Sequence, residues 1–290
     1  KILSLFSLVR GYNIMFIIIA QIVSSIFIFS GYQNIYKVIF DLNIWLIILS
    51  TSTSISAGYI INNFYDSGKD LINRPIKSRL DKLVSQNTKL SFYFVLNFLA
   101  AIMASYVSFR AVVFFSIYIF GIWFYSHKLK KLPFIGNLTS AVLIITPFFA
   151  IFLYYKNFET VIFVHAIFLF LMISMRELTK DLENIKGDLT QNYHTIPVVY
   201  GEEVSKKMLT ILSLLTLVPI YLLLFIYEIG DMYLYFYLSI VLLFVFLILL
   251  WKSKSKMHYL LLHNILKFII VLGVFSILLI DVHVVLNRLF

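Results

Sequence analysis

The chain has 290 residues, of which 61% are hydrophobic and 13% are charged, and its mean hydropathy is +0.94. A soluble domain is about half apolar and about a quarter charged, so this composition predicts a protein whose solvent is the lipid bilayer. The chain has no cysteine, which excludes disulfides, thiolate metal ligands and cysteine nucleophiles.

Nine apolar runs have the length of about 17–25 residues that a helix needs to cross a bilayer. No small-residue cleavage site follows the first run, so we expect no signal peptide. The sequence therefore predicts an all-α, polytopic membrane protein. The expected spans are about 12–31, 41–64, 90–108, 111–127, 135–154, 160–178, 208–228, 232–251 and 265–286.

The basic residues predict how these spans are oriented. If the N-terminus is inside, 20 of the 24 Lys and Arg residues lie on the inner side of the membrane. The positive-inside rule then predicts an inside N-terminus and an outside C-terminus. Topology and anionic lipid headgroups account for the net charge of +10. No motif indicates nucleic-acid binding, so we expect contacts with membrane lipids, no nucleic-acid partner and no obligate protein partner.

The first polar stretch, "NNFYDSGKDLINRP" (residues 62–75), begins where the second apolar run ends. Asn62, Asn63, Asp66 and Asp70 have offsets of 0, 1, 4 and 8, which place them on one face of a helix. A topology signal needs only basic residues. The acidic residues of this stretch therefore require another explanation.

The second polar stretch, "RELTKDLENIKGD" (residues 176–188), follows the sixth apolar run. Glu177, Asp181, Asn184 and Asp188 have offsets of 0, 4, 7 and 11, again on one helical face. If the two helices are neighbours, their carboxylates and amides point at each other across a cavity. Hard oxygen ligands of this kind suit Mg²⁺, which leaves the rest of its coordination sphere to water and phosphate.

A plainer interpretation of these acidic residues is a solvated helix end, or i,i+4 partners for nearby lysines. For either stretch alone this interpretation is the better one. Two such stretches on the same side of the membrane, each with a one-face register, favour a functional site, because acidic residues facing a membrane cavity are costly.

Four segments carry a resemblance to a known family, the UbiA superfamily of membrane prenyltransferases. "LVRGYN" (8–13) resembles its R-x-x-N opening, and "NNFYDSGKDLINRP" its first aspartate-rich motif, N-D-x-x-D-x-x-x-D. "FYSHKLKKLPFIGNLTSAVL" (124–143) is similar to its Y-S-x-x-L-K…G-N segment. "KDLENIKGDLTQNYHTIPVVYG" (180–201) is similar to its second motif, D-x-E-D-x-x-G-D. The resemblance covers the whole chain in order, and it is closest to the branch that makes archaeal-type ether lipids.

The resemblance implies a single transmembrane prenyltransferase domain over residues 1–290, with nine helices around a central cavity. Cytoplasmic motif loops are expected at about 62–89 and 176–206. The active site is expected on the cytoplasmic side of a bacterial or archaeal cell membrane.

The implied reaction is Mg²⁺-dependent transfer of an isoprenyl group from a prenyl diphosphate to a lipid-soluble acceptor, with geranylgeranylglyceryl phosphate as the first choice. Tyr65 and Tyr125 are candidates to shelter an allylic cation. The implied catalytic and metal-binding residues are Asn62, Asn63, Asp66, Asp70, Asp181, Asn184 and Asp188. The implied substrate-binding residues are Arg10, Asn13, Lys69, Asn73, Arg74, Lys77, Arg79, Tyr125, Lys128, Lys130 and Lys180.

Two positions depart from the family pattern, since Asn63 and Asn184 stand where it has aspartate. An asparagine can ligate a metal through its carbonyl oxygen but adds no charge, so we expect weaker Mg²⁺ binding. A member that binds lipid without catalysis is therefore an alternative. Prenylation of an aromatic acid or a quinone precursor is another. A transporter is less favoured, because the apolar spans hold almost no ionisable residue near their midpoints.

Overall fold

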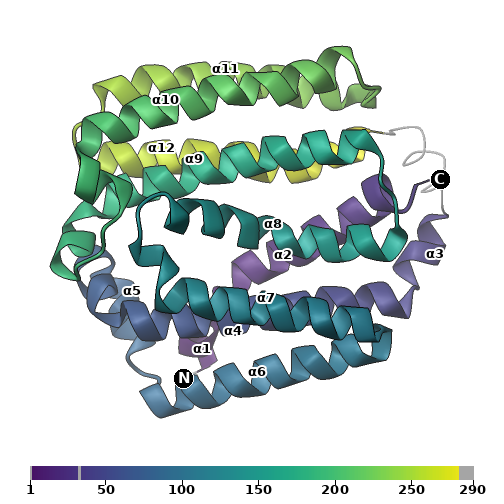
Figure 1. Cartoon of the computed structure of the whole chain (residues 1–290), viewed down its shortest axis with the longest axis horizontal. Coiled ribbons are helices and arrows are strands. Elements are labelled where there is room, and N and C mark those ends of the chain that lie inside the picture. The colour runs from purple at the N-terminus through teal and green to yellow at the C-terminus, as the bar shows by residue number, and fades with distance from the viewer. Residues whose placement is uncertain (1, 32–33, 281–290) are drawn as a thin grey trace.

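The computed structural model describes residues 2–31 and 34–280, and in these ranges every regular element is a helix. The long helices run side by side across the molecule (Figure 1). In chain order the elements are α1 (Ile2–Leu8), α2 (Gly11–Ser24), the π-helical η1 (Ser25–Phe29), α3 (Ile35–Ile39), α4 (Leu42–Asn73), α5 (Pro75–Asp81), α6 (Gln86–Val107), α7 (Phe109–His127), η2 (Leu129–Lys131), α8 (Ile135–Tyr155), α9 (Thr160–Thr190), α10 (Ile196–Phe225), η3 (Gly230–Met232), α11 (Tyr233–Lys252), α12 (Lys256–Ser276) and η4 (Ile277–Leu279).

Nine helical segments in the described ranges are long and apolar enough to cross a membrane, which confirms the predicted number of spans. All nine overlap the predicted ranges, although the predicted end of the last span, residue 286, lies outside the described residues. The chain is an integral membrane protein. The expected inside N-terminus stays a prediction.

The two polar stretches are helical for most of their length and continue the apolar spans that precede them. α4 continues through the first stretch to Asn73, and α9 continues through the second to Thr190. Pro75 explains the end of α4, because a proline disfavours helical backbone at the residue before it, and Arg74 has φ −142° and ψ 64°. The predicted spans end near the first charged residues, because they are defined by their apolar length. A helix can leave the bilayer and continue, as α4 and α9 do.

α10 and α12 begin earlier than predicted, because these helices also extend beyond the apolar residues that cross the membrane. α10 begins at Ile196 with Pro197 in its first turn, where a missing N–H costs nothing. Its backbone is interrupted at Gly201, whose φ of 84° lies in the region that glycine tolerates best. α12 begins at Lys256, after Ser255 accepts a hydrogen bond from the His258 N–H.

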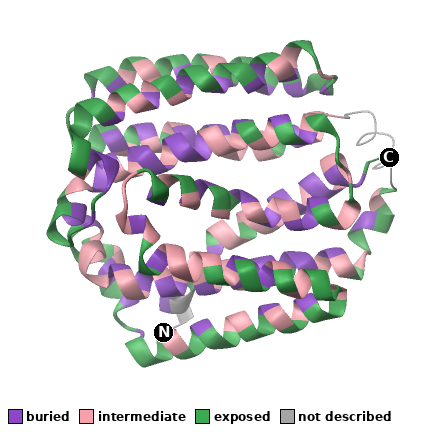
Figure 2. Cartoon of the chain, viewed as in Figure 1, coloured by how far each residue is buried: buried purple, intermediate pink, exposed green. Residues whose placement is uncertain are grey.

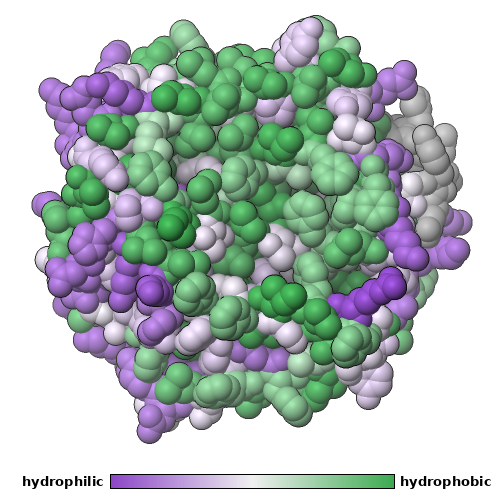
Figure 3. Space-filling model, viewed as in Figure 1, coloured by the Kyte–Doolittle hydropathy of each residue, from purple (hydrophilic) through white to green (hydrophobic). Residues whose placement is uncertain are grey.

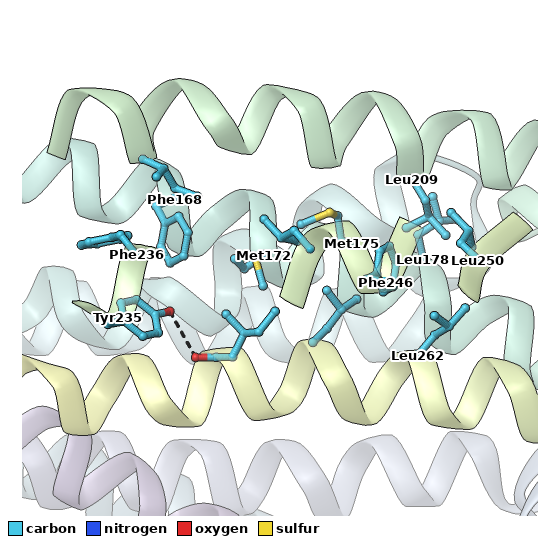
Figure 4. Packing of buried hydrophobic residues seen from close by; sticks show 14 of the residues in the cluster. Phe168, Met172, Met175, Leu178, Leu209, Tyr235, Phe236, Phe246, Leu250 and Leu262 are labelled. Atoms are coloured by element: carbon cyan, nitrogen blue, oxygen red, sulfur yellow. Dashed lines mark hydrogen bonds between the residues drawn. The ribbon is translucent and has the colours of Figure 1, made fainter. Parts of the chain in front are cut away.

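α4 and α9 are the most enclosed of the nine spans, with 61% and 50% of their apolar windows buried. α9 packs with α10, α11 and α12 through a cluster of Leu, Met and Phe side chains (Figure 4). Tyr235 adds a hydrogen bond from its hydroxyl to the Ile269 carbonyl, at 3.1 Å. The helices that carry the polar stretches are thus held on several sides by their neighbours.

The outer faces of the bundle are apolar in their middle. Large apolar side chains such as Phe98, Phe225 and Phe244 are exposed, and exposed residues follow the outward faces of the ribbons (Figure 2). In the face shown in Figure 3, hydrophobic residues cover the centre and hydrophilic ones gather at the two ends of the helices. This pattern fits a bilayer around the middle and water at both ends.

Candidate active site

The last turns of α4 and α9 meet at one end of the bundle, beside α5 (Figure 1). Asn73 is buried there, and its Nδ2 donates to the Asn184 carbonyl at 3.4 Å. A Cβ on Gly187 would lie 2.6 Å from Asn73 Cγ, so only glycine permits this approach. Lys256 of α12 donates to the Asn73 carbonyl at 2.9 Å. Asn73, expected to bind substrate, therefore sits in a helix–helix contact.

Asp66 of α4 lies at the centre of a polar network. It is 8% exposed, and its Oδ1 accepts from Lys130 Nζ at 2.7 Å and from the Tyr193 hydroxyl at 2.7 Å. Lys130 also donates to Asn62 Oδ1 at 3.0 Å. Lys130 belongs to η2, so the "FYSHKLKK" segment and the first motif meet at this carboxylate.

Asp188 of α9 faces the same region. It is fully buried and forms an ion pair with Lys69 of α4. Its Oδ2 accepts from the Thr195 hydroxyl at 3.3 Å. A buried carboxylate needs a partner to offset its desolvation, and this pair connects the two motif helices. Asp66 and Asp188 are thus each neutralised by a lysine.

Tyr193 is the residue that the sequence analysis missed. It is buried in the turn between α9 and α10, and its ring lies 4.7 Å from Lys69 Nζ and 5.3 Å from Lys131 Nζ. Burial and the charge of Asp66 raise the pKa of Tyr193, so its hydroxyl stays protonated and donates to Asp66. The signal that could have found it is its place within the second motif segment, five residues after Asp188.

Asp181, one helical turn before the Asn184 position, is held by Asn137 of α8, whose Nδ2 donates to its Oδ2 at 2.9 Å. Asn137 is the asparagine of the quoted G-N segment, and it was not named as a site residue. Lys180, expected to bind substrate, instead pairs with Glu177. Glu177 also contacts Arg176, with Oε1 and Nη2 3.3 Å apart.

The two asparagines that depart from the family pattern both bond to protein groups other than Asp66 and Asp188. Asn184 is 4% exposed and donates to the Lys180 carbonyl of its own helix at 2.7 Å. Asn63 bonds to Asp81 and Lys89, away from Asp66. The expected single polar face of α4 is therefore divided. Asn62 and Asp66 face η2, whereas Asn63 faces α5 and α6.

The remaining predicted residues lie around this centre. Asp70 is half-buried on α4, and none of the ion pairs in the described residues involves it. Five predicted residues lie outside the network. Arg79 and Lys128 are exposed, and Lys77 pairs with Asp81. Arg10 and Asn13 contact Tyr59. Tyr125 is partly buried near the end of α7.

A comparison with protein families decides how the chain is classified. The model of the UbiA prenyltransferase family matches residues 24–265, which is most of the chain and includes both motif helices. The chain belongs to the UbiA prenyltransferase family.

Relatives of this UbiA-family chain are archaeal. It is 33% identical over 176 residues to a digeranylgeranylglyceryl phosphate synthase of Methanobrevibacter smithii, covering 57% of this chain and 61% of that one. The match spans about three fifths of the length of such curated relatives. A solved structure described as digeranylgeranylglyceryl phosphate synthase in membranes has a TM-score of 0.71 at 22% identity, covering 96% of this chain and 97% of that chain.

A UbiA homologue from Archaeoglobus fulgidus, solved with GPP and Mg²⁺ bound, has a TM-score of 0.68 at 14% identity, over 94% of this chain and 99% of that one. At these identities the solved structures show that the fold is shared. They confirm the all-α fold class that the sequence predicted.

The UbiA-family site offers oxygen donors that suit a hard cation. Asn62, Asp66, Asp70, Asp181 and Asp188 present amide and carboxylate oxygens from α4 and α9, and such oxygens are what Mg²⁺ prefers. No three His, Asp or Glu side chains converge on a common point in residues 2–31 and 34–280. Asp66 and Asp188 are instead each paired with a lysine, Lys130 and Lys69. The donor set fits Mg²⁺ provided that these lysines move.

An apolar pocket lies deeper in the bundle, between η1, α8, α9, α11 and α12. Phe148, Phe168 and Leu169 are among its lining residues, and almost all the others are apolar as well. On α9, Leu169 precedes Asp181 by twelve residues, which is ~18 Å of helix. The pocket therefore lies in the membrane, away from the charged network.

Proposed function

We propose that this protein is a Mg²⁺-dependent prenyltransferase that moves an isoprenyl group from a prenyl diphosphate to a lipid-soluble acceptor. The observation that carries the proposal is the pairing of Lys69 and Lys130 with Asp188 and Asp66 at one buried site. A metal-bound diphosphate requires carboxylates for the metal and basic groups for the phosphates. Both kinds of group lie together where α4 and α9 meet.

The two lysines have a second role in this proposal. Without ligand they neutralise Asp66 and Asp188, which would otherwise be buried charges without a partner. When a diphosphate binds, its oxygens compete for the ammonium groups of Lys69 and Lys130, and the freed carboxylates become available to Mg²⁺. The bound cation supplies charge stabilisation for the departing diphosphate. Binding of the diphosphate frees the carboxylates for the cation, and binding of the cation frees the lysines for the diphosphate. Cation and substrate should therefore bind with positive cooperativity.

Departure of the diphosphate leaves an allylic cation, and aromatic rings beside the lysines can stabilise it. Tyr193 has the best position, because its ring already lies within 6 Å of the ammonium groups of Lys69, Lys130 and Lys131. A cation near an aromatic face is favoured by about 0.5–2 kcal/mol. Tyr65, 5.9 Å from Lys130 Nζ, is the second ring of this kind.

The acceptor is proposed to be geranylgeranylglyceryl phosphate, as the name of the relatives suggests. Arg74, whose backbone N–H donates to the Asp70 carbonyl, is proposed to supply positive charge for its phosphate. The hydroxyl of the acceptor must lose a proton as the new C–O bond forms. Asp70, which forms no ion pair in the described residues, is the proposed base. The apolar pocket beyond Leu169 is proposed to hold the far end of the donor chain.

The proposal is tested with detergent-purified protein and geranylgeranyl diphosphate. Diphosphate release is measured with and without Mg²⁺, and with either geranylgeranylglyceryl phosphate or 4-hydroxybenzoate as acceptor. Release that needs both Mg²⁺ and the glycerophosphate supports the full proposal. Release that needs the aromatic acid replaces the acceptor. If folded protein binds the diphosphate but releases none with either acceptor, the chain binds lipid without transferase activity.

A donor series tests the proposed path of the chain. Geranyl, farnesyl and geranylgeranyl diphosphates are compared in the wild type and in Leu169→Trp, which narrows the pocket about 18 Å from the Asp181 position. The substitution should raise KM for the longest donor and leave the shortest one nearly unchanged. An equal loss with all three donors would contradict this path.

A further inference from the structure

A second polar cluster lies behind the candidate active site, where α1, α4, α5 and α6 meet. We call it the Asp81 cluster. Three of its members are almost completely buried, with exposures of 2% for Asp81, 2% for Lys89 and 6% for Asn63. Its members are Ser7, Asn63, Lys77, Asp81 and Lys89.

The Asp81 carboxylate accepts bonds from three elements. Asn63 Nδ2 donates to Oδ2 at 2.9 Å, Lys77 Nζ donates to the same oxygen at 2.6 Å, and the Ser7 hydroxyl donates to Oδ1 at 3.4 Å. Asn63 and Lys77 come from α4 and α5, and Ser7 comes from α1. The carboxylate therefore fastens α1 and the short α5 to the central helix.

Asn63 uses both ends of its side-chain amide. While Nδ2 donates to Asp81, Oδ1 accepts from Lys89 Nζ at 2.9 Å. A carboxylate can only accept and an ammonium group can only donate, so the two partners fix the orientation of the amide. An aspartate cannot make both bonds, because its carboxylate has no N–H to offer Asp81.

An aspartate at position 63 would also bring two carboxylates together. One of its oxygens would replace Nδ2, only 2.9 Å from Asp81 Oδ2. Two buried carboxylates at such a distance do not both stay ionised without cost, so one must take up a proton or move away. The asparagine that departs from the family pattern therefore suits the presence of Asp81.

The cluster holds the basic segments that border the active site. Arg74 is the junction between α4 and α5, and Arg10 is the N-cap of α2, two residues after the end of α1. The Arg74 backbone N–H donates to the Asp70 carbonyl at 2.8 Å, so Arg74 lies one helical turn beyond this residue of the site. If α1 and α5 were released from Asp81, the backbone segments that carry Arg10 and Arg74 would no longer be fastened to α4.

We propose that Asn63 is a positioning residue rather than a ligand of the catalytic cation, and that it acts by fastening α5 and α1 through Asp81. This inference rests on the proposed prenyltransferase function, which it deepens. Asn62, the preceding residue, faces Lys130 and Asp66 and belongs to the cation site.

The test compares Asn63→Asp, Asp81→Asn and the double variant Asn63→Asp/Asp81→Asn. The double variant exchanges the carboxylate and the amide, so the cluster keeps the same groups and the same charge. We expect Asn63→Asp to lower kcat roughly tenfold and the double variant to recover most of that loss. A double variant no more active than Asn63→Asp would overturn the inference.

Metal binding gives a readout that does not depend on activity. Mn²⁺ binding is followed by electron paramagnetic resonance, with Asn62→Asp as the matched control because it makes the same change one residue earlier. Asn62→Asp should tighten Mn²⁺ binding severalfold, and Asn63→Asp should leave it unchanged while lowering Tm in metal-free detergent solution. Tighter Mn²⁺ binding by Asn63→Asp would make it a ligand position.

The two readouts separate the two proposals. If the wild type transfers no prenyl group, the proposed function fails, but the Mn²⁺ and Tm comparison still decides the role of Asn63. If the wild type is active and the exchange does not restore Tm or kcat, only the inference about Asn63 fails.

Discussion

The candidate active site and the Asp81 cluster are both buried, both contain aspartate and lysine, and both involve α4. They differ in how completely the acidic groups are bonded. Asp81 accepts from an amide, an ammonium group and a hydroxyl. Asp70 forms none of the described ion pairs, and Asp188 Oδ1 has only its lysine partner.

This difference indicates which cluster binds a ligand. A fully bonded polar network stabilises one arrangement of the helices and gains nothing from a new partner. A network with unused acceptors gains when a cation arrives, because buried oxygens without donors are costly. For acidic residues at the end of a membrane helix, the number of acceptor oxygens without a donor is therefore a better indication of a ligand site than the number of acidic residues.

The largest expected effect comes from removing a carboxylate of the active site. Asp188→Ala should lower transfer by about 10³-fold, since it removes a cation ligand and leaves Lys69 without its partner. Asp81→Asn should cost far less, because an amide oxygen at position 81 can still accept from Asn63. Diphosphate release measures both variants. Equal losses would remove the distinction between the two clusters.

The sequence predicted much of this arrangement, and its failures have physical reasons. The nine spans followed from apolar run length, and the helical spacing of Asp66, Asp181 and Asp188 was visible in the offsets. The division of Asn62 from Asn63 was not, because offsets of 0 and 1 differ by about 100° and only the neighbouring helices decide which side each faces. Sequence alone does not say that Asp81 and Lys89 flank Asn63.

Tyr193 and Asn137 were missed for another reason. Each bonds to an acidic residue far away in sequence, at separations of 127 and 44 residues. A spacing rule within one helix cannot find such partners. Lys180 is the opposite case, since its expected role comes from the motif while its partner in the structure, Glu177, is three residues away on the same helix. Its role in substrate binding stays a prediction.

The next largest effect concerns the contact that brings the two motif helices together. Gly187→Ala places a methyl group against Asn73, which must move and lose its bond to the Asn184 carbonyl. Overpacking of this kind costs about 1–3 kcal/mol, so Tm and transfer should both fall. Asn73→Ala in the same chain should recover part of the Tm. Absence of any recovery would show that the methyl group clashes elsewhere.

A smaller effect is expected from the hydroxyl of Tyr193. Tyr193→Phe keeps the ring near the lysines and removes only the bond to Asp66, which as a bond to a charged group is worth about 1.5–3 kcal/mol. Transfer should fall by roughly ten- to a hundredfold. Because burial and Asp66 raise the pKa of Tyr193, its hydroxyl is protonated throughout the neutral range. The pH profile of the remaining activity should therefore keep its shape, and a profile that shifts would mean that Tyr193 itself exchanges a proton.

The smallest effect should come from Lys77, although it contacts the same carboxylate as Asn63. Its side chain is 27% exposed, and it is paired with Asp81 four residues away on one short helix. Because the Lys77 ammonium group keeps contact with water, the pair should contribute less than a fully buried one, so Lys77→Met should change Tm and transfer less than the other variants. Lys89, which is 2% exposed and bonds to Asn63, is the matched comparison. Lys89→Met should lower Tm clearly more than Lys77→Met. The reverse order would mean that the cluster is held together by charge at its surface and not by the buried amide, and Asn63 would lose the role proposed for it.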